Sequence, residues 1–277
     1  MQSKPSNLTI GFIGGGNMAT ALIAGLANKL TNADRIHVID LNTESVTRLS
    51  QQYGVGTASV MDDKLRDLDV VIFAVKPQQM QQVIASFAPF LKSQLLLSVA
   101  AGIRADDMSR WLGGYQKIVR AMPNTPAMIG KGMSGLFALA AVDAEQRANV
   151  QMIMQAVGDT LWVEQESMID AVTAISGSGP AYVFYFIEAL QEAAVALGFD
   201  TMQAQQLAMS TFSGAVQLAQ QSDDPVQILR EKVTSKGGTT YAALSSMDQH
   251  DLKNIIALAT QAAAQRGKEL GDEFGQY

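Results

Sequence analysis

The feature that most constrains the fold is an apolar run at residues 8–13 that leads directly into three glycines, Gly14, Gly15 and Gly16. An apolar helical pattern follows through Leu30, so this segment predicts a strand, a tight turn and a helix. Similar apolar runs lie at residues 36–39, 70–75, 95–99 and 117–120, separated by stretches of helical length. Strands joined by crossover helices pair in parallel with right-handed connections. We therefore expect a doubly wound α/β sheet over residues 8–165.

The second half of the chain is predicted to be helical. From about Ser167 the β-branched runs disappear, and segments rich in Ala, Leu, Met and Gln lie at residues 180–197, 201–221, 225–233, 239–246 and 250–270. Residues 181–187 are apolar on every side, whereas a surface helix of a monomer has one apolar stripe. We expect a second subunit to enclose this helix, and a division into domains at residues 1–166 and 167–277.

Composition excludes several classes of function. Of the 277 residues 48% are hydrophobic, enough for buried cores, and the net charge of −6 argues against a nucleic-acid partner. The chain has no cysteine and two histidines, so we expect no metal site. The opening residues resemble no signal peptide, and Glu188, Gln191 and Glu192 interrupt the most apolar later stretch. The sequence therefore predicts a cytoplasmic protein with no membrane partner.

The first glycine turn predicts a dinucleotide site of the Rossmann type. Residues 14–19 fit the pattern G-x-G-x-x-G/A, whose glycines let the backbone approach a pyrophosphate at a helix N-terminus. Asp40 ends the second predicted strand, where a carboxylate accepts a hydrogen bond from the ribose 2′-hydroxyl and favours NAD. Asn42 could instead donate to a 2′-phosphate, with Arg35 or Arg48 supplying positive charge, and Asp40 could simply cap a turn. The choice between NADPH and NADH stays open.

A second glycine turn, at residues 233–240, lies between two predicted helices. Glycines and hydroxyls at a helix start offer N–H and O–H donors together with the positive end of the helix dipole, which suits a small carboxylate. The alternative is that Ser235 or Thr239 merely caps the helix. A similar turn at residues 176–180 is better explained by tight packing.

Few side chains are candidates for proton transfer. His37 lies inside a strand pattern, His250 begins the last helix, and Lys76 follows a strand at the edge of the sheet where cofactors bind. A reaction that needs little acid or base assistance fits this inventory. Reduction of a C=N bond that is already protonated meets that condition.

Six segments together resemble the pyrroline-5-carboxylate reductases. They are residues 11–19 (GFIGGGNMA), 74–77 (AVKP), 100–102 (AAG), 120–127 (RAMPNTPA), 176–184 (SGSGPAYVF) and 233–240 (VTSKGGTT). Many dehydrogenases share the first segment, whereas the last three in this order are specific. The resemblance implies an N-terminal Rossmann-type doubly wound sheet followed by an all-α dimerisation domain. It also implies reduction of 1-pyrroline-5-carboxylate to L-proline with NADPH or NADH, the last step of proline biosynthesis, in a homodimer that in some members assembles into a decamer of five dimers.

The resemblance also assigns residues. The dinucleotide would contact Ile13, Gly14, Gly15, Gly16, Asn17, Met18, Ala74, Val75, Lys76 and Pro77, with Asn42 where the 2′-phosphate is read, beside Asp40. Ala100, Ala101 and Gly102 would approach the ribose and nicotinamide. The substrate carboxylate would be held by Ser235, Gly237, Gly238 and Thr239, and the catalytic hydroxyl of Thr240 would reach the ring nitrogen.

Lys236 departs from the family pattern, which usually has proline between the serine and the glycine pair. The lysine could support binding of the carboxylate or could be simply solvated.

Two alternative functions remain at this point. A β-hydroxyacid dehydrogenase shares the Gly-Phe-Ile-Gly opening, but it uses a lysine with an asparagine one helical turn further along. Here Lys253 and Asn254 are adjacent and cannot share a helix face. The other alternative is a dinucleotide sensor without turnover, in which Ser235 and Thr240 should not matter.

Overall fold

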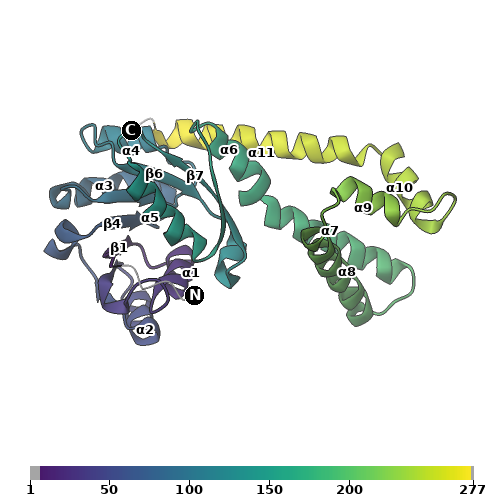
Figure 1. Ribbon diagram of the computed structural model, residues 1–277, viewed down its shortest axis with the longest axis horizontal. Coiled ribbons are helices and arrows are strands. Elements are labelled where there is room, and N and C mark those ends of the chain that lie inside the picture. Colours follow the sequence, from purple (N-terminus) through teal and green to yellow (C-terminus); the bar gives the residue numbers. More distant parts are fainter. Residues whose placement is uncertain (1–6, 276–277) are drawn as a thin grey trace. The chain divides into compact units, whose positions relative to one another are not determined.

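The computed structural model describes residues 7–275. The chain forms two compact units (Figure 1). Unit 1 contains the described residues up to Ser178 and those from Ala263 onward, and unit 2 is Gly179–Ala262.

Unit 1 is built on one eight-stranded sheet. Its strands, in chain order, are β1 (Ile10–Ile13), β2 (Ile36–Ile39), β3 (Gly56–Ala58), β4 (Val70–Phe73), β5 (Leu95–Ser98), β6 (Ile118–Met122), β7 (Gly132–Ala138) and β8 (Gly158–Trp162). They lie in the order β3-β2-β1-β4-β5-β6-β7-β8. The reversal of strand order beside β1 makes the sheet doubly wound, which confirms the predicted fold class.

Alternate residues of the central strands fill two cores, one on each face of the sheet. In β4, Val70 and Ile72 pack into the core that contains residues of α1 (Asn17–Leu26) and α5 (Ala144–Gln155). Val71 and Phe73 pack into the other core, with residues of α3 (Met80–Phe87) and α4 (Ala105–Trp111). Because both faces are covered, the strands read as continuous apolar runs, which is why the sequence revealed them.

Three strands escaped prediction, and one pairing differs from the parallel arrangement expected. Strand β3 has three half-buried residues, β7 contains two glycines, and β8 alternates between half-buried and exposed positions, so none shows a continuous apolar run. Strand β7 pairs antiparallel with β6. The two are joined by a short 3-10 segment, η5 (Thr125–Ile129), rather than by a crossover helix, and such a connection permits antiparallel pairing.

The last five helices, α7 to α11, follow the predicted ranges closely. Unit 2 contains α7 (Gly179–Ala196), α8 (Thr201–Gln221), α9 (Val226–Lys232) and α10 (Thr239–Gln249). Helix α11 (Leu252–Gly275) begins in unit 2 and ends in unit 1. In unit 1, α2 (Thr43–Tyr53) follows β2, and α6 (Met168–Val172) leads into a π-helical turn, η6 (Thr173–Gly177).

Helix α7 carries an apolar surface. The side chains of Phe184 and Tyr185 are 64% and 71% exposed in the single chain, and Val183 and Leu190 are also exposed. Several large apolar residues exposed on one helix are typical of an interaction site. Across residues 7–275, none of the helices combines the length and apolarity that crossing a bilayer requires.

Candidate functional site

A cleft of about 620 Å³ lies at the carboxyl ends of β1, β2 and β4 in unit 1. This is the edge of a doubly wound sheet where ligands bind. The predicted residues that line it are Ile13, Gly14, Gly16, Asp40, Asn42, Ala74, Val75 and Lys76. The fold thus brings the ends of three predicted strands together around one cavity.

The glycine loop has the backbone that close approach to a phosphate requires. Gly14 has a φ of +103°, and a Cβ there would lie 2.5 Å from the carbonyl oxygen of Ala74, so a larger residue would displace the loop. A Cβ on Gly16 would meet nothing within 4 Å, which shows open space beside the start of α1. Asn17 and Met18 form the first turn of α1, whose N–H groups have no partner within the helix. These features fit the pyrophosphate of a dinucleotide.

Asp40 fixes this loop to the loop that follows β2. One carboxylate oxygen accepts the N–H of Gly15 at 2.6 Å, and the other accepts the N–H of Asn42 at 2.8 Å. The hydroxyl of Ser45 donates to the carbonyl of Gly15 at 2.8 Å. The turn role that the sequence left open for Asp40 is therefore present in the structure.

Asn42 caps α2 with its amide oxygen, which accepts the N–H groups of Glu44 and Ser45. The amide nitrogen is consequently the part of this side chain that can donate to a ligand in the cleft. Neither Arg35 nor Arg48 is among the residues that line the cleft, and Arg35 donates to the carbonyl of Asn7 at 2.7 Å.

Lys76 is the one cation among the described residues that line the cleft. It directly precedes Pro77, the first residue of the 3-10 segment η3 (Pro77–Gln79), which leads into α3. A lysine ammonium at this position can pair with a phosphate.

The loop after β5 holds Ala100, Ala101 and Gly102, which do not line the cleft. The N–H of Ala100 approaches the hydroxyl of Ser98 at 3.3 Å, and Gly102 lies against α11.

The second glycine turn lies in unit 2, at the start of α10. The N–H of Gly238 donates to the carbonyl of Ser235 at 3.0 Å, which closes the turn. The N-cap residue of α10 is Gly238, which has no side chain, and no side-chain hydrogen bond caps this helix. Neither Ser235 nor Thr239 therefore caps it. Thr239 and Thr240 occupy the first turn, where the helix leaves N–H groups unpaired. The side chains of Ser235, Lys236 and Thr239 are exposed and that of Thr240 is half-buried.

Neither histidine lines the cleft. His37 is 6% exposed, and its Nε2 lies 3.1 Å from a carboxylate oxygen of Asp62. His250 is exposed, and its Nδ1 lies 2.8 Å from the carbonyl of Ser246. Each histidine therefore has a polar partner in the protein.

The turn at residues 176–180 joins the end of the π-helical η6 to the start of α7, and it packs tightly. The amide nitrogen of Asn124 donates to the carbonyl of Ser176 at 3.1 Å, and a Cβ on Gly177 would lie 2.7 Å from Met122. This packing agrees with the interpretation made from the sequence.

Sequence reasoning missed part of the cleft lining. Residues Ser59, Val60, Met61, Gln79, Gln82, Val83, Ser86 and Phe90 form that part. The first three follow β3, which was too short and polar to be recognised, and the others lie on one side of α3 and its flanks. The stretch of helical length between residues 75 and 95 follows a strand that ends at the cleft. The residues of that helix that face the strand ends could have been named from the sequence.

Two described segments match family models. Residues 166–270 match the model "Pyrroline-5-carboxylate reductase dimerisation", and residues 9–102 match "NADP oxidoreductase coenzyme F420-dependent". The two matches fall on the helical region and on the first strands of the sheet.

Relatives and solved structures agree over nearly the whole chain. The chain is 41% identical to the pyrroline-5-carboxylate reductase of Pseudomonas aeruginosa, over 96% of this chain and 98% of that protein. The structure of a pyrroline-5-carboxylate reductase from Coxiella burnetii has a TM-score of 0.90 and 38% identity, and the match covers 96% of this chain and 99% of that one. The pyrroline carboxylate reductase of Plasmodium falciparum, solved with NADP bound, has a TM-score of 0.85 and 30% identity, with 97% and 100% covered. The chain therefore belongs to the pyrroline-5-carboxylate reductase family.

Proposed function

We propose that the protein reduces 1-pyrroline-5-carboxylate to L-proline with NADPH or NADH, the last step of proline biosynthesis. The observation that carries this proposal is the agreement in sequence and fold with pyrroline-5-carboxylate reductases over 96% of the chain. The dinucleotide cleft in unit 1 and the glycine turn at the start of α10 supply the two kinds of site that such a reaction needs.

The cleft residues hold the cofactor in this proposal. The first turn of α1 and the side chain of Lys76 face the phosphates, while Asp40 and Asn42 face the adenosine ribose. Ala100, Ala101 and Gly102 support the nicotinamide end. When bound, NADPH or NADH supplies the hydride that adds to the imine carbon.

The glycine turn of unit 2 holds the substrate carboxylate. The hydroxyl of Ser235 and the N–H groups of the first turn of α10 donate to it, and the helix dipole favours the negative charge. Residues 237 and 238 are glycines, which keep side chains away from this surface. Binding through the carboxylate fixes the orientation of the ring.

Thr240 is the proposed catalytic residue. Thr240 follows Thr239 in the first turn of α10. In this proposal its hydroxyl contacts the ring nitrogen. The nitrogen arrives protonated, so the electron pair of the C=N bond goes to nitrogen when the hydride reaches carbon. No side chain has to supply a proton in that step.

The β-hydroxyacid dehydrogenase alternative has no support in the structure. Lys253 and Asn254 are neighbours in α11, and the ammonium of Lys253 lies 3.9 Å from Asp248 on the surface. The sensor alternative predicts cofactor binding without turnover, and the kinetic test below distinguishes it.

We further propose a homodimer that forms through the helices of residues 167–277, with dinucleotide binding assigned to residues 1–166. The apolar surface of α7 and the match to a dimerisation model support this division. A decamer of five dimers and a cytoplasmic location complete the proposal.

Replacement of Thr240 tests the assigned mechanism. Thr240→Ala should lower kcat about 10- to 100-fold, because one hydrogen bond to a charged group contributes about 1.5–3 kcal/mol. The dissociation constant of NADPH should not change. Thr240→Ser retains the hydroxyl and should keep most of the activity. Unaltered kinetics in Thr240→Ala would remove this residue from the site.

A further inference from the structure

The last turns of α11 cover the loop that joins β5 to α4. Gly102 in this loop has a φ of +74°, and a Cβ there would lie 3.1 Å from the ring of Phe274 and 3.3 Å from the Cβ of Leu270. The backbone of the loop is therefore in direct contact with the helix. A side chain at this position would push the two apart.

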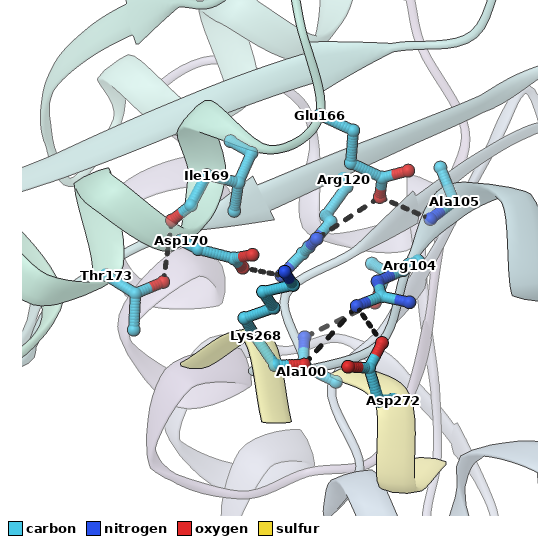
Figure 2. A network of polar contacts seen from close by, with 11 residues as sticks. Ala100, Arg104, Ala105, Arg120, Glu166, Ile169, Asp170, Thr173, Lys268 and Asp272 are labelled. Atoms are coloured by element: carbon cyan, nitrogen blue, oxygen red, sulfur yellow. Dashed lines mark hydrogen bonds and ion pairs between the residues drawn. The ribbon is translucent and has the colours of Figure 1, made fainter. Parts of the chain in front are cut away.

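Arg104 fastens the helix to the same loop. Its Nη2 donates to a carboxylate oxygen of Asp272 at 2.7 Å and to the carbonyl of Lys268 at 3.3 Å (Figure 2). A Cβ on Gly271 would lie 2.9 Å from the guanidinium, so the guanidinium lies against the helix backbone. These contacts bind residues 268–272 of α11 to the end of the loop.

A buried ion cluster holds the loop from its other side. One carboxylate oxygen of Glu166 accepts both the N–H of Ala105, at 2.6 Å, and Nη1 of Arg120, at 3.2 Å (Figure 2). Nη2 of Arg120 reaches Asp170 at 3.3 Å, and the side chain of Arg120 is 3% exposed. The start of α4 is thus held by the ion cluster on one side, and the preceding residues lie against α11 on the other.

We propose that Arg104 and Asp272 are positioning residues for hydride transfer: they hold α11 against residues 100–102 and thereby fix the surface that supports the nicotinamide. This inference rests on the function proposed above. Hydride transfer needs reacting atoms about 3–3.5 Å apart, so a small shift of the supporting loop lowers the rate steeply. The adenosine end binds in the separate cleft beside Asp40, so affinity should change little.

The pair is tested by Asp272→Ala, with Asp272→Asn as the conservative variant. Asp272→Ala should lower kcat about five- to tenfold, with the KM for pyrroline-5-carboxylate and the dissociation constant of NADPH within about twofold of the unaltered protein. Asp272→Asn keeps an acceptor oxygen and should recover most of the rate. The matched control is Glu273→Ala, which breaks a 2.7 Å ion pair with Arg266 on the same helix and should leave kcat unchanged.

A second measurement uses the protein without cofactor. Amide hydrogen exchange over residues 99–105 should be faster in Asp272→Ala than in the unaltered protein or in Glu273→Ala, with equal exchange in the strands of the sheet. Unchanged exchange and unchanged kcat in Asp272→Ala would overturn the inference, as would an equal loss of rate in Glu273→Ala. If the unaltered protein reduces no pyrroline-5-carboxylate, the proposed function itself fails, which is a distinct result.

Discussion

At the scale of single residues, Asp40 both lines the cleft and holds the glycine loop in place. Its position after β2 is the one at which a carboxylate reads a ribose 2′-hydroxyl. In the structure both of its oxygens accept backbone N–H groups, from Gly15 and from Asn42. In the described structure the carboxylate therefore stabilises the conformation of the glycine loop.

Asp40→Ala should consequently weaken both cofactors. We expect the dissociation constants of NADPH and NADH each to rise about tenfold, because the loop loses two charge-assisted hydrogen bonds. Fluorescence titration of both nucleotides measures this. A variant that binds NADPH more tightly than the unaltered protein would show instead that the carboxylate acts mainly by repelling the 2′-phosphate.

Lys236 lies in the turn proposed to hold the substrate, at the position where the resemblance leads one to expect proline, and it is exposed. If its charge attracts the substrate carboxylate, Lys236→Gln should raise the KM for pyrroline-5-carboxylate about two- to fourfold at low salt. The difference should shrink as salt screens the charge. Lys236→Pro serves as the comparison that restores the family residue. A KM that is the same in all three proteins at every salt concentration would leave the lysine as a solvated side chain.

At the scale of elements, burial separates the predicted strands from two of the three that were missed. Strands β1, β2, β4 and β5 are buried at every position, and an apolar run on both faces is visible in sequence. Strands β3 and β8 lie at the two edges of the sheet and are only half-covered, so their residues follow no apolar run. Position in the sheet, which depends on distant pairing, therefore hid β3 and β8. Strand β7 is internal and mostly buried, and its two glycines interrupt the apolar pattern instead.

The parts of the site that could be predicted are those that a local sequence pattern encodes. Glycine turns carry their own local signature, so Gly14, Gly16 and the start of α10 could be located from sequence. Arg104, Arg120 and Glu166 meet through segments far apart in the chain, and no spacing rule links them. A charged residue inside the apolar strand β6, Arg120, was the one sign of that cluster.

The ion cluster also predicts a dependence of stability on pH. Burial raises the pKa of Glu166 above its ordinary value of 4.5, although the Ala105 N–H and Arg120 act in the opposite direction. A raised pKa means that the folded state binds more protons than the unfolded state, so this residue's contribution to stability falls as pH rises through and above 4.5.

Glu166→Gln keeps an acceptor for Ala105 and has no such titration. As pH rises from 4 to about 7, the free energy of unfolding of Glu166→Gln should increase relative to that of the unaltered protein. Denaturant unfolding at several pH values measures both. If the free energy of unfolding of Glu166→Gln instead falls relative to the unaltered protein as pH rises, Arg120 holds the pKa of Glu166 below its ordinary value.

At the scale of the whole molecule, the exposed apolar residues of α7 and the match to a dimerisation model indicate association with a further subunit. Phe184 and Tyr185 are 64% and 71% exposed, so the described residues leave most of their surface uncovered. A second copy of the chain would bury this surface.

Phe184→Glu places a charge on that surface and should shift the protein from dimer to monomer, because an unpaired charge in an apolar interface is strongly unfavourable. Sedimentation or light scattering measures the mass. Ile129→Glu, at a residue 78% exposed in unit 1, is the matched control and should remain dimeric. A dimeric Phe184→Glu variant would place the interface elsewhere.

The central claim is that the chain reduces a cyclic imine with a nicotinamide cofactor. Its most direct test follows the loss of near-ultraviolet absorbance of NADPH, and separately of NADH, when 1-pyrroline-5-carboxylate is added to the purified protein. We predict rapid loss with at least one cofactor, together with formation of an equal amount of L-proline. Binding of both nucleotides with no loss of absorbance would contradict the account and favour the sensor.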